Sequence, residues 1–181
     1  MAGVAEIARN LRLGAGQEET TQLGPIVSSR QVERISDLVK SGIADGARAV
    51  AGGHRPDRTG WFFEPTVLAD VRPDMQVIRE EIFGPVVCAM SFKDRSEIKQ
   101  MANDTPYGLG ASIWTRNLDH AHLLADDIDA GTVWFNTHNV LDLAVPFGGS
   151  KMSGIGREFG TEAINAFTEP KSVVMRLAGD Y

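Results

Sequence analysis

Alternating strand-like and helix-like segments in the second half of the 181-residue chain constrain its fold most. Residues 86–92 form a nearly continuous apolar run, which is expected of a strand buried on both faces. Two further extended runs, 109–115 and 132–135, follow it, and each is preceded by an amphipathic segment, 94–102 and 117–128. A strand–helix–strand–helix–strand order with short connections predicts an α/β fold with a parallel sheet and right-handed crossovers.

The first half of the chain predicts two amphipathic helices and short extended segments. Val4 opens an apolar series at helical spacing, which Gly14 ends. A second helix is expected to begin after Ser28 or Ser29, either of which can cap it, and to run to about residue 44. Short extended segments are expected over 47–51 and 61–71.

Composition excludes several classes of protein. The formal net charge is −6, with 24 acidic and 18 basic residues, so no basic footprint for nucleic acid or an anionic membrane is expected. No apolar run approaches the roughly 20 residues that span a bilayer. One cysteine, Cys88, excludes an internal disulfide framework, and no two histidines share the spacing of metal ligands on a helix, so no metal site is predicted. We expect a reduced, cytoplasmic protein.

Two features that invite a chemical role favour structural interpretations. Cys88 lies among apolar neighbours with no basic residue beside it, so we interpret it as an inert core residue and not as a nucleophile. The glycine-rich stretch 148–158 has neither dinucleotide-binding nor Walker A spacing, and it follows a loop instead of a strand. Its glycines are expected to allow tight turns and close backbone approach.

The adjacent carboxylates Glu80 and Glu81 are not expected to share a proton, because neighbouring side chains of an extended segment point in opposite directions. From composition alone we interpret both as solvated, with Gly84 and Pro85 forming a turn. His138 is likewise interpreted as a polar loop residue with no evident partner to make it a base. Taken alone, these residues indicate a soluble α/β domain.

Six stretches of the chain form recognisable motifs: 22–25 (QLGP), 79–86 (REEIFGPV), 103–109 (NDTPYGL), 131–136 (GTVWFN), 146–158 (PFGGSKMSGIGRE) and 168–174 (TEPKSVV). In this order, and over essentially the whole chain, they resemble the aldehyde dehydrogenase family, and residues 79–86 are the most specific of them. The resemblance implies an oxidoreductase that converts an aldehyde to a carboxylic acid with NAD or NADP. In that family a cysteine attacks the aldehyde to form a thiohemiacetal, hydride passes to the nicotinamide, and a glutamate activates water.

The resemblance assigns four residues of this chain to sites. Glu81 is similar to the carboxylate that hydrogen-bonds the ribose beside the nicotinamide, and Phe83 to the aromatic residue that packs near it. Leu141 and Phe147 fall where the family lines its aldehyde pocket. An apolar lining accepts aromatic and aliphatic aldehydes alike.

The same resemblance implies that this chain is the C-terminal portion of the catalytic domain. The dinucleotide-binding half, the nucleophilic cysteine, the oxyanion asparagine and the glutamate base all belong upstream in the family, so no catalytic residue is assigned here. Residues 1–167 are expected to form the truncated catalytic domain, and 168–181 the oligomerisation strand and tail, with the strand itself at 171–177. We therefore expect a homo-oligomer that is inactive alone.

Two other hypotheses stay open. In the first, the chain is a non-catalytic protein that associates with a full-length relative. In the second, it is a remnant of the enzyme that binds nucleotide through Glu81 without catalysis. The second is disfavoured because a single ribose contact gives little affinity.

Overall fold

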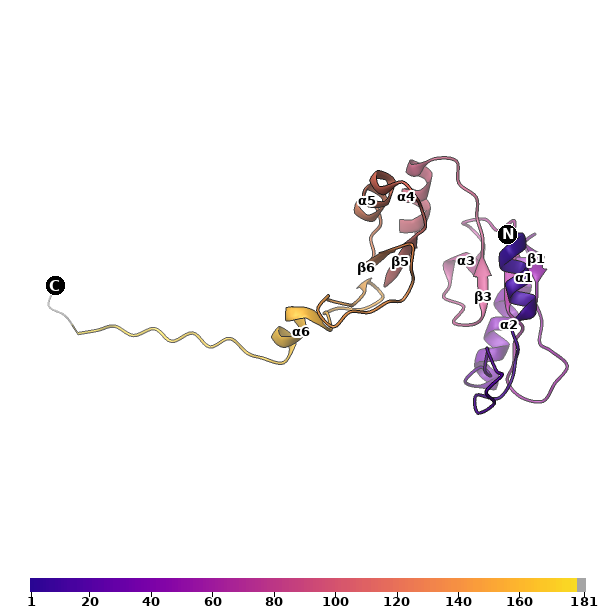
Figure 1. Ribbon diagram of the computed structural model, residues 1–181, viewed down its shortest axis with the longest axis horizontal. Coiled ribbons are helices and arrows are strands. Elements are labelled where there is room, and N and C mark those ends of the chain that lie inside the picture. Colours follow the sequence, from indigo (N-terminus) through magenta and orange to yellow (C-terminus); the bar gives the residue numbers. More distant parts are fainter. Residues whose placement is uncertain (179–181) are drawn as a thin grey trace. The chain divides into compact units, whose positions relative to one another are not determined.

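The structure, a computed structural model, describes residues 1–178 (Figure 1). The chain divides into two compact units, the first spanning Met1–Phe92 and the second beginning at Lys93. Each unit has its own sheets and helices, and each is described separately below.

The first unit is built on a three-stranded sheet in the order β1-β2-β3. Strands β1 and β2 run antiparallel, whereas β2 and β3 run parallel, with Thr66 opposite Val86. Its elements are α1 (Ala2–Asn10), α2 (Ser29–Ala44), β1 (Arg48–Ala51), β2 (Thr66–Ala69), α3 (Gln76–Arg79) and β3 (Val86–Cys88). The two helices predicted for this half of the chain are confirmed here.

Helix α2 supplies one side of the first unit's core. Its apolar residues recur at helical spacing and place Ile35 and Val39 fully out of solvent, against Phe63 and Leu68. The helix begins after Ser28, whose Oγ accepts a hydrogen bond from the backbone N–H of Gln31 at 3.3 Å. Of the two serines that could cap this helix, Ser28 is therefore the one that does.

The second unit contains two small sheets. Strands β5 and β6 pair in parallel, with Ser112 opposite Trp134, and β4 and β7 pair antiparallel. Its elements are α4 (Arg95–Asn103), β4 (Tyr107–Gly108), β5 (Gly110–Ile113), α5 (Leu118–Asp127), β6 (Thr132–Phe135), β7 (Ser150–Lys151) and α6 (Gly160–Ala166).

Both helices between the predicted strands of this unit are capped as their sequences indicate. Asp94 accepts a hydrogen bond from the Glu97 N–H, and Asn117 accepts one from the His120 N–H. The Glu97 carboxylate reaches back one residue further than in a capping box, to the N–H of Lys93. The local sequence therefore determines where α4 and α5 begin.

The expected burial of the strand at 86–92 on both faces is wrong. Only Val86–Cys88 is a strand, and Val87 and Phe92 are exposed. The strand pairs with β2 on one side, and β5 belongs to a different sheet, so the three predicted strands do not form one parallel sheet. An apolar run indicates that a strand can be buried, but its partners come from distant parts of the chain.

The strand expected at residues 171–177 is not formed. Residues 168–178 lie in no helix or strand, and they extend away from α6 in Figure 1. A strand is stable only where a neighbour satisfies its backbone hydrogen bonds, and this segment pairs with no strand in the described part of the chain. The last three residues of the predicted tail, 179–181, lie outside the described residues.

Candidate functional site

The loop that joins α3 to β3 contains both residues expected at a nucleotide site, and side chains of α2 hold its backbone. The Nε2 group of Gln31 donates to the carbonyls of Ile82 and Phe83, each at 3.0 Å. Arg34 donates from Nη2 to the Glu81 carbonyl at 2.9 Å. Because Gln31 and Arg34 lie about one turn apart on α2, the buried packing of that helix fixes the loop.

The conformation of this loop directs the Phe83 ring outward. Phe83 adopts a left-handed backbone, with φ of +52°, and is 73% exposed. A Cβ on the next residue, Gly84, would lie 2.5 Å from Cδ1 of buried Ile35, so a larger residue there would require Ile35 to move. A left-handed backbone at a non-glycine residue such as Phe83 persists only where its surroundings enforce it, and it is commonest at functional sites.

The two adjacent glutamates differ in their surroundings. Glu80 accepts hydrogen bonds from Gln76 at 2.6 Å and from Arg34 at 3.0 Å, and these contacts lower the pKa of its carboxyl group. The interpretation of Glu80 as merely solvated is therefore wrong. The Glu81 side chain is exposed and has no hydrogen-bond partner among the described residues. An unengaged carboxylate beside an exposed aromatic ring suits a ligand with vicinal hydroxyls and a flat heterocycle.

Leu141 and Phe147, the residues expected in an aldehyde pocket, lie in the second unit, on the loop between β6 and β7. Leu141 is 47% exposed. Phe147 is partly buried and exchanges two backbone hydrogen bonds with Glu158, each 2.8 Å long. Glu81 and Phe83 belong to the first unit, so the two predicted pairs sit on separately folded parts of the chain.

Sequence reasoning missed the partner of His138. The Nδ1 atom of its ring lies 2.7 Å from Ser112 Oγ, and the ring makes a T-shaped contact with Trp134, with centroids 5.4 Å apart. The expectation that His138 lacks a partner is therefore wrong. Ser112 stands opposite Trp134 in the β5–β6 pairing, so only the strand register reveals this contact.

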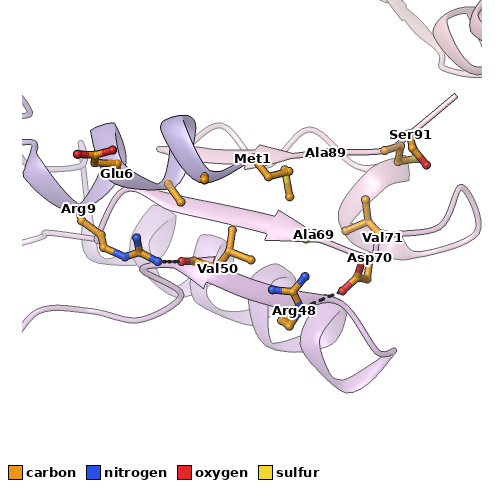
Figure 2. A pocket seen from close by; sticks show the side chains of 13 residues that line it. Met1, Glu6, Arg9, Arg48, Val50, Ala69, Asp70, Val71, Ala89 and Ser91 are labelled. Carbon is orange, nitrogen blue, oxygen red and sulfur yellow. Dashed lines mark hydrogen bonds and ion pairs between the residues drawn. The ribbon is translucent and has the colours of Figure 1, made fainter.

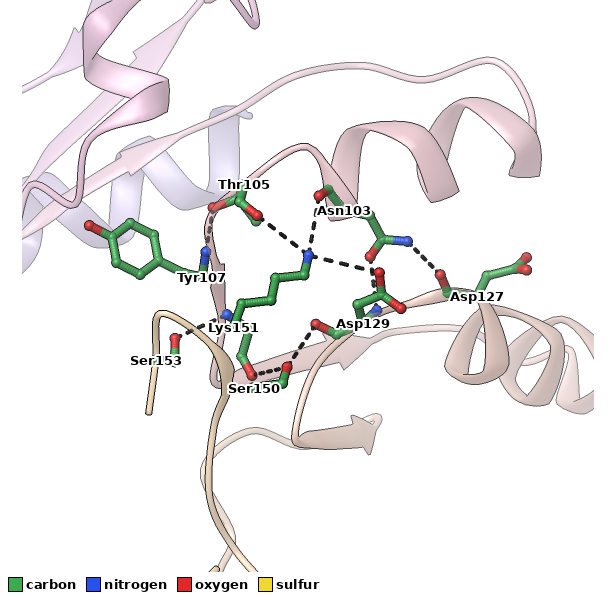
Figure 3. A network of polar contacts seen from close by, with 9 residues as sticks. Asn103, Thr105, Tyr107, Asp127, Asp129, Ser150, Lys151 and Ser153 are labelled. Atoms are coloured by element: carbon green, nitrogen blue, oxygen red, sulfur yellow. Dashed lines mark hydrogen bonds and ion pairs between the residues drawn. The ribbon is translucent and has the colours of Figure 1, made fainter. Parts of the chain in front are cut away.

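The glycine-rich stretch serves close backbone approach, as predicted. A Cβ on Gly131 would lie 1.7 Å from the Gly148 carbonyl oxygen. Lys151, with φ of +54°, donates from Nζ to the carbonyls of Asn103 and Thr105 at 3.2 and 3.4 Å (Figure 3). Ser150 Oγ donates to the Gly108 carbonyl at 3.0 Å. This polar network holds the 148–153 turn against the segment after α4.

The first unit also carries an open cavity of about 750 Å³, formed by α1, β1, β2 and residues 89–91 (Figure 2). Arg9 donates to the Val50 carbonyl there, and Arg48 pairs with Asp70 at 3.0 Å. None of the four predicted site residues lines it. Cys88 is half-buried nearby in the sheet, and burial raises the pKa of its thiol, as its interpretation as an inert residue requires.

Comparison with known proteins identifies the family. The profile of the Aldehyde dehydrogenase family matches residues 1–173, and the chain therefore belongs to that family. It is 47% identical over 174 residues to a Bacillus subtilis (strain 168) protein named "Putative aldehyde dehydrogenase DhaS", and 43% identical over 176 residues to a betaine aldehyde dehydrogenase of Sinorhizobium fredii. Each alignment covers 96% of this chain.

The fold matches solved members as well. The structure of the aldehyde dehydrogenase from Bacillus cereus in complex with NAD⁺ aligns with a TM-score of 0.91 and 45% identity over 95% of this chain. The chain spans 35% of that structure, and 35% and 36% of the two relatives above. It thus covers about a third of the length of the proteins it resembles.

No helix among residues 1–178 is both long and apolar enough to cross a membrane. No group of three or more histidine, cysteine, aspartate or glutamate side chains in the same part of the chain is arranged to hold a metal ion.

Proposed function

We propose that this chain is the C-terminal portion of the catalytic domain of an NAD(P)-dependent aldehyde dehydrogenase, an enzyme that oxidises an aldehyde to a carboxylic acid. The observation that carries the proposal is the α3–β3 loop, which presents Glu81 and Phe83 unengaged while Gln31 and Arg34 of α2 fix its backbone. Family membership supplies the reaction class.

The proposed roles follow from the chemistry of each side chain. The Glu81 carboxylate would accept hydrogen bonds from the ribose hydroxyls of the cofactor, and the exposed Phe83 ring would pack near its nicotinamide. Leu141 and Phe147 would line the aldehyde pocket with apolar surface. Bound NAD⁺ or NADP⁺ supplies the acceptor for the hydride, and the chain's own contribution is to orient the ribose and exclude water.

No residue of this chain is proposed as the nucleophile. Cys88 is half-buried in β3 with a raised thiol pKa, which disfavours the thiolate that would attack a carbonyl. We therefore propose that the chain is inactive alone. We also propose that residues 1–167 belong to the catalytic domain and 168–181 to the segment that mediates homo-oligomerisation, in a cytoplasmic protein.

The test begins with the intact mass of the native protein, captured from its source with an antibody raised against this chain. We expect a mass well above 19.6 kDa, together with NAD- or NADP-dependent aldehyde oxidation. A native mass of 19.6 kDa contradicts assignment as part of a longer enzyme.

Adjacent glutamates provide a matched pair of variants in that active protein. Glu81→Gln is expected to raise the KM for the cofactor about tenfold or more, because a charge-assisted hydrogen bond to the ribose is lost. Glu80→Gln serves as the control, since the Glu80 side chain faces Arg34 and Gln76. Equal cofactor KM values in both variants contradict the role of Glu81.

The exposed apolar tail supports a second candidate, a non-catalytic protein that associates with a full-length relative. Val173, Val174, Met175 and Leu177 are all exposed on an unpaired segment. Co-purification of an intact dehydrogenase subunit with a native protein of 19.6 kDa is the result that favours this function.

A further inference from the structure

The loop that follows β6 leaves the sheet at the carboxyl end of a parallel strand pair, the place where ligands most often bind in α/β proteins. Its first residue, Asn136, has φ of +52° and exchanges two hydrogen bonds with Thr115, the residue that lies just beyond β5. Both amide–backbone distances are 2.9 Å. This exchange fixes the direction in which the loop leaves the strand.

Three side chains then hold the loop against the strand pair: Ser112 of β5, Trp134 of β6 and His138 of the loop. The Ser112–His138 hydrogen bond, at 2.7 Å, is compatible with either neutral tautomer, because a hydroxyl can donate or accept. The rings of His138 and Trp134 meet edge to face at an interplanar angle of 69°, which restricts the orientation of the imidazole. We call these residues the Ser112–Trp134–His138 cluster.

The cluster is linked directly to the residue beside Leu141. Trp134 Nε1 donates to the carbonyl of Val140 at 2.8 Å. Asn139, between His138 and Val140, has a left-handed backbone with φ of +56°, a conformation that costs free energy unless surrounding contacts enforce it. Val140 and Leu141 are both exposed, so apolar packing does not hold them in place. Hydrogen bonding through the cluster therefore sets the path of the loop up to Leu141.

We propose that Ser112, Trp134 and His138 act as positioning residues that set the location of Leu141 and thereby the size of aldehyde that the enzyme accepts. This inference rests on the proposed function, in which Leu141 lines the aldehyde pocket. The cluster acts through the backbone of residues 138–141 and makes no contact with the reacting atoms. Its effect is confined to substrates that reach Leu141, so short aldehydes are insensitive to it.

The first part of the test uses the 181-residue chain labelled at the indole nitrogens of its tryptophans. Hydrogen exchange of the Trp134 Nε1–H is expected to be about fivefold faster in Ser112→Ala and His138→Ala, because the bond to Val140 opens more often. Ser112→Thr, which keeps the hydroxyl, should restore the slow rate. The indoles of Trp61 and Trp114 are exposed and lie outside the cluster, so they serve as internal controls and should exchange at unchanged rates.

The second part compares aldehydes of increasing chain length in the active native protein. Ser112→Ala is expected to raise KM several-fold for long aldehydes, while KM for acetaldehyde and kcat for both stay unchanged, and Ser112→Thr should reverse the shift. An unchanged exchange rate of the Trp134 Nε1–H in both alanine variants would show that the cluster does not hold the loop. Faster exchange with the same KM change for every aldehyde overturns its role in specificity. Lack of aldehyde oxidation by the unsubstituted protein contradicts the proposed function, and the exchange rates still decide whether the cluster holds the loop.

Discussion

Asp127 forms ion pairs with two basic side chains. It ends α5 and receives Arg95 Nε at 2.6 Å and Lys99 Nζ at 2.9 Å, both from α4. These hydrogen bonds lower the pKa of the Asp127 carboxyl group, and the bond from Arg95 has the larger effect. A carboxylate with a lowered pKa in the folded state stabilises the protein above its ordinary pKa, and this stabilisation is lost as pH falls through the lowered value.

Replacement of this carboxylate should therefore have a pH-dependent effect on folding. Asp127→Asn is expected to lower the free energy of unfolding at pH 7, and the difference from the unsubstituted chain should shrink as pH falls below about 4. Urea unfolding followed by circular dichroism at several pH values measures it. The adjacent exposed Asp126, as Asp126→Asn, is the control and should show a much smaller change. A pH-independent deficit in Asp127→Asn would contradict the ionic explanation.

At the scale of elements, α2 connects the core of the first unit to its candidate site. One side of the helix packs Ile35 and Val39 into the core, while Gln31 and Arg34 hold the loop that presents Glu81 and Phe83. Fraying of its first turn would loosen Gln31, which lies three residues after the cap. The stability of α2 is therefore expected to affect the site as well as the fold.

The two neighbouring serines at the start of α2 allow a direct test of the cap. Ser28→Ala should destabilise the chain by about 1 kcal/mol, because the Gln31 N–H loses its acceptor. Ser29→Ala, one residue further on, should change stability by less than about 0.5 kcal/mol. Thermal and urea unfolding of both variants measure the difference. An equal loss of unfolding free energy in the two variants would contradict the assignment of Ser28 as the cap.

At the scale of the whole molecule, the residues after α6 expose apolar side chains with no pairing strand among the described residues. Val174 is 94% exposed, and Val173, Met175 and Leu177 are nearly as open. An unpaired Val-rich segment can gain backbone hydrogen bonds and buried apolar area by adding to a sheet of another molecule. The expectation of self-association made from the sequence therefore also has a physical basis in the structure.

This association should be visible in the isolated chain. Light scattering at micromolar concentration is expected to give a mass above that of a monomer, and Val174→Lys should shift it toward the monomer. Val27→Lys introduces the same change at a comparably exposed valine far from the tail in sequence, and should leave the mass unchanged. A clean monomer for the unsubstituted chain would rule out this role for the tail.

Local chemistry in the sequence determined α2, α4 and α5, and the apolar neighbours of Cys88 indicated the burial that raises the pKa of its thiol. Asp94 and Asn117 cap α4 and α5 because their side chains bond to N–H groups only three residues away, a contact that sequence spacing alone specifies. Apolar periodicity located α2 in the same way. The family was recognisable from motifs, of which residues 79–86 are the most specific.

Contacts between distant residues were decided only by the tertiary structure. The engagement of Glu80 by Arg34 joins residues 46 positions apart, and the Ser112–His138 bond joins residues 26 apart. The pairing of β3 with β2 instead of β5, and the absence of a strand at 171–177, likewise depend on which backbone lies alongside. The physical reason is that helix caps are satisfied within one turn, whereas a strand or a loop side chain finds its hydrogen-bond partner only after the chain has folded.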